Sequence, residues 1–405
     1  MQAAAALACA GRCAILLARQ RPALSAVLDQ EDRLVIAAGV LYLLIAISFF
    51  DRITMWMAGD ALSHAKMIRM LIDGMMLPVS MPGLGSYYEY YPKGFHYYSY
   101  LLARAFPILG VIQTVPVLIT AVTPFLLFSL VREMRQEVEA AYAFLLACLV
   151  FPAHYSYLIW GGYPSAAAEM LLVAAVLAAV MEVRLVAVLL FGVLLAHARV
   201  AVLTCGALLG YVTAKRLDRR IALAGFAALA AVAAALVLFA PIHKPEFLAY
   251  VFSSQSLSSE FFARWYPVFL VLFGAVIAIC RRELLDRLAL GWACAVVLIV
   301  LLADMGPLSF IGTADRLLLV LYLPLSLLGA VALSRMDGGD GRIRNLFMLL
   351  LIVVGSTAMG LVFYSYAESW GLPHEDYDAI MWLWRLNLSD AICINLDETG
   401  PGYIP

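Results

Sequence analysis

Charged residues are scarce in this chain of 405 residues: Asp, Glu, Lys and Arg make up 14% of it, against about a quarter in soluble globular proteins. The sequence also lacks a Rossmann glycine fingerprint, a Walker loop, an HExxH motif and any CxxC pair among its seven cysteines. These absences exclude the common motifs for binding dinucleotides, nucleoside triphosphates and zinc. The formal net charge of −1 gives no indication of a nucleic-acid partner.

Apolar residues dominate the composition of the sequence. They make up 64% of the sequence, and the mean hydropathy is +0.92. Polar side chains are therefore too few to cover a soluble body of this size. The composition predicts an all-α polytopic membrane protein of the cell membrane, whose membrane-crossing helices satisfy their own backbone hydrogen bonds.

Apolar runs bounded by charged residues, proline or glycine predict about 11 transmembrane helices. They cover residues 34–50, 108–131, 140–154, 165–181, 184–197, 199–214, 221–240, 264–280, 287–303, 316–334 and 345–365. The more polar segment 94–107 is expected to dip into the membrane without crossing it. The chain then divides into an N-terminal cytoplasmic or interfacial segment (1–33), a transmembrane domain (34–365) and an extracytoplasmic tail (366–405).

Five arginine-bearing segments set the expected orientation. They are the N-terminal segment, "REMRQ" (132–136), "KRLDRR" (215–220), "RRELLDR" (281–287) and "RMDGGDGRIR" (335–344). The predicted spans place all five on one side, and the positive-inside rule makes that side cytoplasmic. The segments expected on the opposite, extracytoplasmic side are 51–93, 155–164, the 197–199 turn, 241–263, 304–315 and the tail.

The stretch "MWMAGDALSHAKMIRMLIDG" (55–74) concentrates polar residues in a long first outward loop that is expected to carry amphipathic helices. Residues 60–73 predict a helix on which Asp60 and His64, four positions apart, share one face. The simpler interpretation is an amphipathic helix at the membrane interface, followed by a belt of tyrosines. The functional interpretation is a catalytic site in which Asp60 is a general base, or a ligand for a divalent cation such as Mg²⁺ or Mn²⁺.

Several stretches carry a resemblance to a known family. They are "GDALSHAKMIRMLIDG", which is followed by "YYPKGFHYYSYLLA", then "IWGGYPSAAAEMLL" (159–172), "ADRLLLVLYLPLSLLGAVAL" (314–333) and "DYDAIMWLWRLNLSDAICINLDETGPGYIP" (376–405). In these motifs and in layout the chain resembles membrane glycosyltransferases of the GT-C superfamily, closest to bacterial and archaeal members of uncharacterised type. It departs from them at Ala61, where many members have a second acid, and at Lys93, where relatives often have proline.

The resemblance implies transfer of a sugar from a polyprenyl-phosphate donor to a glycan, lipid or protein acceptor on the extracytoplasmic side. An inverting transfer needs a carboxylate to activate the acceptor hydroxyl, the catalytic role expected of Asp60 with His64 beside it. It also needs cations that stabilise the departing lipid phosphate. The candidates for donor binding are Arg199 with His197 beside it, then Lys93, His96 and Arg316, and Tyr163 is a candidate for stacking on the sugar.

Other interpretations of these residues stay open. Arg199 fits a snorkelling side chain at a span end, Arg316 a helix-end anchor, and Tyr163 an aromatic belt. Glu169 lies one turn into a predicted span, where we expect it to reach the outer interface. The alternative function is a polytopic transporter or lipid flippase, against which the lack of a hydropathy repeat argues.

The C-terminal tail contains one apparent β-strand. The apparent strand "AICINL" in the tail has no other predicted strand to pair with, and an isolated strand is unstable. We therefore expect the tail to be the start of a small α/β outer segment that continues in a longer protein.

Overall fold

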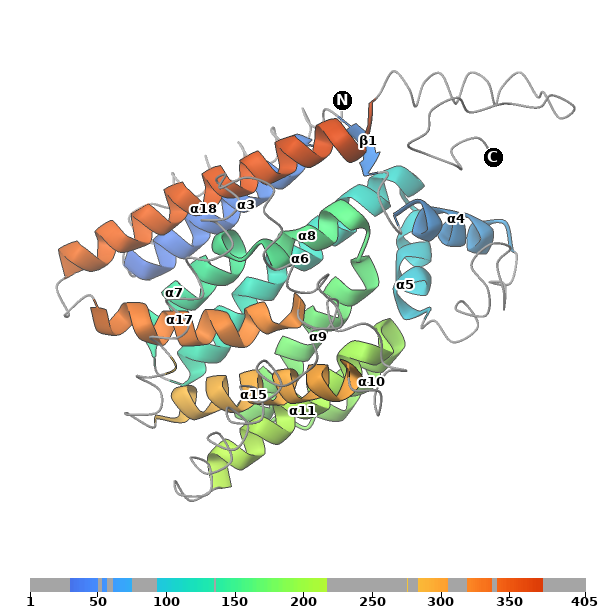
Figure 1. The fold of residues 1–405 in the computed structure, drawn as a ribbon. Helices are drawn as coiled ribbons and strands as arrows, with labels where there is room; N and C mark the ends of the chain where they lie inside the picture. Colours follow the sequence, from blue (N-terminus) through green and yellow to red (C-terminus); the bar gives the residue numbers. More distant parts are fainter. Residues whose placement is uncertain are drawn as a thin grey trace, which may run out of the picture.

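The computed structural model describes residues 30–49, 53–56, 61–74, 93–134, 136–216, 275, 283–304, 319–336 and 341–373. Within them the protein is helical apart from two short strands (Figure 1). The helices are α3 (Gln30–Phe49), α4 (Ala61–Ile72), α5 (Gly94–Ala103), α6 (Ile108–Glu133), α7 (Glu137–Leu145), α8 (Pro152–Trp160), α9 (Tyr163–Val180), α10 (Val186–Ala196), α11 (Ala198–Arg216), α15 (Leu284–Asp304), α17 (Tyr322–Met336) and α18 (Gly341–Trp370).

Five helical stretches of the described residues are long and apolar enough to cross a membrane. They are Ile108–Glu133, Glu137–Ile159, Tyr163–Val180, Leu319–Met336 and Gly341–Tyr364. Large apolar side chains are exposed on α18 and α10, including Leu346, Leu349, Val353, Val188 and Phe191. Such surfaces are unfavourable in water and suit contact with lipid. The prediction of a helical protein with apolar helices of membrane-crossing length is confirmed for the described residues, whereas the count of eleven spans stays a prediction. The predicted runs 221–240 and 264–280 lie outside the described residues except for residue 275.

The segment expected as an outward loop at 155–164 is largely helical, which corrects the sequence prediction. A π-helical turn (η2, Leu146–Val150) follows α7, and α8 then continues to Trp160. Pro152 occupies the first turn of α8, where its missing N–H leaves no hydrogen bond unmade. The helix ends at Gly161, whose φ of +83° is in the left-handed region that glycine adopts readily. The chain therefore turns at Gly161 and not at residue 155.

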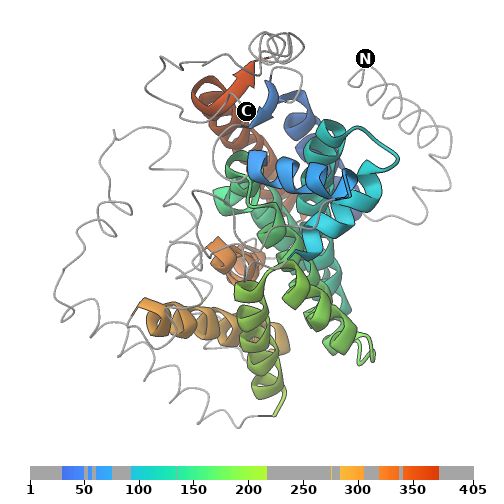
Figure 2. The same ribbon diagram turned by 90° about the vertical axis from the view of Figure 1, so that its right-hand side faces the viewer.

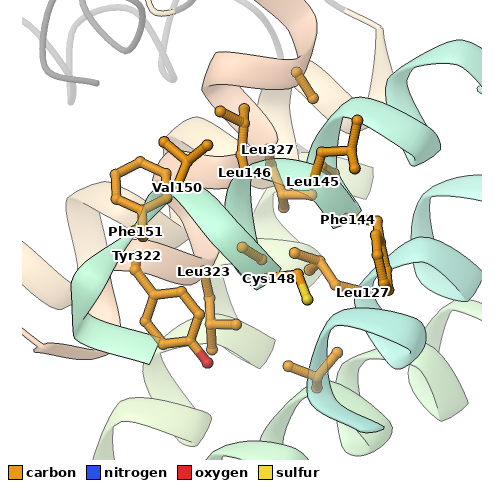
Figure 3. Close-up of a cluster of buried hydrophobic side chains, with 14 of the residues drawn as sticks. Leu127, Phe144, Leu145, Leu146, Cys148, Val150, Phe151, Tyr322, Leu323 and Leu327 are labelled. Atoms are coloured by element: carbon orange, nitrogen blue, oxygen red, sulfur yellow. The ribbon is translucent and has the colours of Figure 1, made fainter. Parts of the chain in front are cut away.

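The core is built around α7 and η2, whose residues from Ala140 to Val150 are all buried. Figure 3 shows Leu146, Cys148 and Phe151 of this segment among Leu323 and Leu327 of α17. Two glycines allow helices to approach closely. A Cβ on Gly329 would lie 2.7 Å from Leu146 Cδ1, and one on Gly355 of α18 would lie 2.8 Å from Leu149 Cβ. Small residues at such crossings are typical of helix packing in membranes.

Ion pairs join the helices at one end of the bundle, on the left in Figure 1. They are Arg132–Asp32 (2.6 Å), Arg344–Glu31 (2.8 Å), Arg335–Glu283 (3.3 Å) and Arg335–Glu139 (3.8 Å). Their members come from the segments 132–136, 281–287 and 335–344, from the start of α3 and, for Glu139, from α7. These segments therefore lie together at one end of the bundle, and their cytoplasmic location stays a prediction.

Replacing Arg335 with methionine is expected to lower the free energy of unfolding by about 2 kcal/mol, because it leaves the buried Glu139 without its cation. Chemical denaturation of the purified protein in detergent would measure this. The matched control is Arg69→Met, which breaks an exposed pair with Asp73 and is expected to cost less than about 0.5 kcal/mol. Equal costs for the two variants would contradict a structural role for the Arg335 cluster.

The opposite end of the bundle carries α4, α5 and the strand pair. Strand β1 (Ile53–Trp56) pairs antiparallel with β2 (Gly371–Pro373), with Ile53 opposite Pro373 and Trp56 opposite Gly371. Figure 2 views the molecule from this end, with α4 and α5 nearest the viewer. The start of the first predicted outward loop and the start of the tail thus lie together, as the predicted orientation requires. The tail strand "AICINL" lies outside the described residues.

Candidate functional site

Helix α4 is amphipathic, as the sequence predicts. His64, Met67 and Ile68 are buried on one side, while Lys66 and Arg69 are exposed on the other. Arg69 Nε lies 3.0 Å from Asp73 Oδ2, one turn further along the helix. The apolar side therefore fixes α4 against the bundle, and His64 points inward with it.

His64 and His96 form a hydrogen-bonded pair at the end of the bundle. His64 Nδ1 lies 2.8 Å from Nε2 of His96 on α5, and His64 Nε2 lies 3.0 Å from the carbonyl oxygen of Gly161. His64 is 3% exposed and His96 is not exposed at all. The pair therefore joins α4, α5 and the turn between α8 and α9, three segments far apart in the sequence.

The Gly161 carbonyl determines the proton positions in this pair. A carbonyl only accepts, so Nε2 of His64 must carry a hydrogen. In a neutral pair, His64 Nδ1 then accepts from Nε2–H of His96. This arrangement leaves the lone pair of His96 on Nδ1. The Lys93 carbonyl beside this ring can only accept a hydrogen bond, so it favours the protonated form of His96.

Burial keeps both rings neutral. It lowers the pKa of His64 from its usual 6.5 to about 4, with the hydrogen bond to Gly161 acting in the opposite direction. The pKa of His96 is lowered to about 2, chiefly by burial and also by the neighbouring His64 and Lys93 as positive charges. An added proton would therefore need a nearby anion to stabilise it.

A close backbone contact positions the start of α5. A Cβ on Gly94 would lie 2.6 Å from the carbonyl oxygen of Leu195, at the end of α10. Lys93 precedes this glycine, and His197 follows Leu195 by two residues. His197 is buried in an extended conformation between α10 and α11. The structure thus brings the segments of three predicted donor-binding residues, Lys93, His96 and His197, to the same end of the bundle.

Aromatic rings pack around the histidine pair. The Tyr163 ring centroid lies 5.8 Å from that of His64 and 6.1 Å from that of Phe95, whose ring also contacts His96. Tyr163 is 1% exposed. Its contact in this structure is with the histidine pair, so it supports the pair from the side, and a contact with sugar stays a prediction.

Three predicted site residues are not placed by the structure. Asp60, which directly precedes α4 in the sequence, and Arg316 lie outside the described residues, as does the side chain of Arg199 at the start of α11. Among the described residues, no group of three or more His, Cys, Asp or Glu side chains could hold a metal ion. Both ring nitrogens of His64 are already hydrogen-bonded, and Asp60, the predicted ligand of a divalent cation, lies outside the described residues, so the cation site stays a prediction.

Searches against protein-family models and curated proteins find no match to this chain. The case for a function therefore depends on the residues themselves.

Glu169 is a polar residue whose placement the sequence did not predict. We expected it at the outer interface, but it is 1% exposed, and Tyr157 of α8 donates a hydrogen bond to its Oε1. The sequence signal for its burial was the presence of an acid inside an apolar run. Its partners lie on other helices, so no local sequence pattern could identify them.

Proposed function

We propose that this protein is a membrane glycosyltransferase that moves a sugar from a polyprenyl-phosphate donor to an acceptor on the extracytoplasmic side. The observation that carries the proposal is the buried His64–His96 pair, held next to Lys93 at the end of the bundle opposite the arginine-bearing segments. The family resemblance of the sequence supports it independently. The eleven-span topology, the location in the cell membrane and a glycan, lipid or protein acceptor belong to the same proposal.

In this proposal Asp60 accepts the proton of the attacking acceptor hydroxyl, while Lys93 and His96 bind the lipid phosphate. His64 is a positioning residue, because its two ring nitrogens hold His96 to the Gly161 turn. An incoming phosphate would raise the pKa of the histidine pair, which would take up a proton and then bind the anion as a cation. Arg199, His197 and Arg316 are further candidates for phosphate binding, and Tyr163 for the sugar.

The pair predicts a pH dependence of donor binding. The free pair is neutral and the phosphate-bound pair is protonated, so binding takes up a proton and the affinity should rise as the pH falls from about 8 to about 6. His96→Gln keeps a polar side chain but cannot become a cation. We expect it to weaken donor binding about 10-fold at the lower pH and to remove the pH dependence.

The measurement is binding and transfer of labelled sugar from polyprenyl-phosphate donors by the full-length protein in membranes. The matched control is Lys66→Gln on the exposed side of α4, which should bind the donor as the wild type does. If the wild-type protein binds and consumes none of a panel of such donors, the glycosyltransferase proposal is wrong. If His96→Gln binds the donor normally at both pH values, the phosphate-binding role is wrong.

The alternative, a transporter or lipid flippase, is favoured by one observation. Ionisable residues within membrane helices often mark the path of a substrate or ion, and the buried Glu169 lies in such a helix. A transporter would move its substrate into sealed proteoliposomes without consuming a sugar donor. That result would replace the enzymatic proposal.

A further inference from the structure

Four polar side chains, none of them a member of the histidine pair, meet among the apolar helices. They are His154 and Tyr157 of α8, Glu169 of α9 and Tyr322 of α17, and we refer to them as the Glu169 cluster. Each is at most 2% exposed. Burying a carboxyl group among apolar helices is costly, so such groups are usually retained for function.

The members of the Glu169 cluster form a connected series of polar contacts. Tyr157 donates to Oε1 of Glu169. The Tyr322 hydroxyl lies near the same carboxyl group, whose Oε2 makes no hydrogen bond of normal geometry. On its other side, the Tyr322 hydroxyl lies 3.1 Å from Nδ1 of His154. Tyr322 therefore bridges an acid and a base that belong to different helices.

A hydrogen-bond acceptor lies next to His154, the last member of this hydrogen-bonded series. The Thr120 carbonyl of α6 lies beside the His154 ring, although His154 Nε2 makes no hydrogen bond of normal geometry there. Pro124, four residues further along α6, has no N–H to offer that carbonyl. The carbonyl is therefore available to orient an Nε2–H of His154.

When His154 carries a hydrogen on Nε2, two arrangements of the remaining protons satisfy the hydrogen bonds that link Glu169, Tyr322 and His154. In the neutral one, Glu169 is protonated and donates to Tyr322, which donates to Nδ1 of His154. In the charged one, Tyr322 donates to the Glu169 carboxylate and accepts from a protonated Nδ1 of His154. They interconvert when the Glu169 O–H and the original Tyr322 O–H break while a new Tyr322 O–H and a His154 N–H form, with no oxidant or other reactant.

We propose that Glu169, Tyr322 and His154 form a buried proton relay, a proton-binding site distinct from the donor site. The other titratable groups that act on its members are Tyr157, Tyr42 of α3 and Cys148 of η2. All three are neutral near neutral pH in their ordinary state. The proton shared between Glu169 and His154 is thus the charge that changes in the cluster.

The test follows the carboxyl and histidine groups directly in the full-length protein in lipid nanodiscs, without any sugar donor. When the pH is raised until the cluster releases the shared proton to water, infrared difference spectra should show the loss of a protonated-carboxyl band. Tyr322 then donates to the Glu169 carboxylate and no longer to Nδ1 of His154. The band should be lost in Glu169→Gln and kept in Glu139→Gln, a control that removes a buried acid at the opposite end. The NMR resonances of His154 in isotope-labelled protein should change at the same pH as the band.

Tyr322→Phe removes only the bridging hydroxyl and preserves the packing of α17, so it tests the relay even if Glu169→Gln fails to fold. In this variant the infrared and histidine transitions should separate to different pH values. The relay is wrong if no pH-sensitive carboxyl band depends on Glu169, or if Tyr322→Phe leaves the two transitions coincident. Neither readout depends on glycosyl transfer, so failure of the relay and failure of the proposed function are distinguishable.

Discussion

Replacing Asp60 with asparagine is expected to lower the turnover of the polyprenyl-phosphate donor at least about 100-fold, with donor binding largely kept. Asparagine has nearly the shape of aspartate but cannot accept the proton of an acceptor hydroxyl. Asp60 directly precedes α4, and the hydrogen bonds of His64 fix that helix against α5 and the Gly161 turn. The measurement is the rate of transfer of labelled sugar in membranes at saturating donor.

The matched control is Asp73→Asn, which removes a carboxylate just beyond the other end of α4. Asp73 is exposed and forms an ion pair with the exposed Arg69, so its loss should leave turnover near that of the wild type. Turnover that survives Asp60→Asn would assign the base to another residue. If turnover fell in both variants alike, the general charge of the loop would be responsible and not Asp60.

Much of the fold could be predicted from the sequence, because apolar runs long enough to cross a membrane have few structural alternatives. The run 108–131 coincides with α6, and the run 345–365 lies within α18. The error at 155–164 arose from treating polar and aromatic residues there as a loop. Pro152 and Gly161 are the residues that set the limits of α8, and both signals were present in the sequence.

The site was predictable in part. The sequence selected His64 and His96 separately, but their contact spans 32 residues, and the contact with Gly161 spans 97. No local spacing encodes these distances, since they depend on how α4, α5 and α8 pack at the end of the bundle. The Glu169 cluster shows the same limit, because Tyr157, Glu169 and Tyr322 lie on three helices that only the tertiary fold brings together.

Packing at the start of α5 gives the second large effect that we expect. In Gly94→Ala the new Cβ would lie 2.6 Å from the Leu195 carbonyl oxygen and 2.9 Å from its carbon, both backbone atoms that cannot rotate away. Helix α5 must then move off α10, taking Lys93 and His96 with it. We expect a loss of about 2 kcal/mol in the free energy of unfolding from overpacking. Transfer activity should fall about 100-fold, since a displacement of about 1 Å in a site can have this effect.

The control for this substitution is Gly360→Ala on α18, where a Cβ would meet nothing within 4 Å. Alanine is the better helix former, so this variant should be as stable as the wild type or slightly more so, and equally active. Denaturation in detergent and the transfer assay measure both quantities. If Gly94→Ala lost stability but kept full activity, the start of α5 would be a structural contact only, and Lys93 and His96 would no longer be candidates for the lipid phosphate.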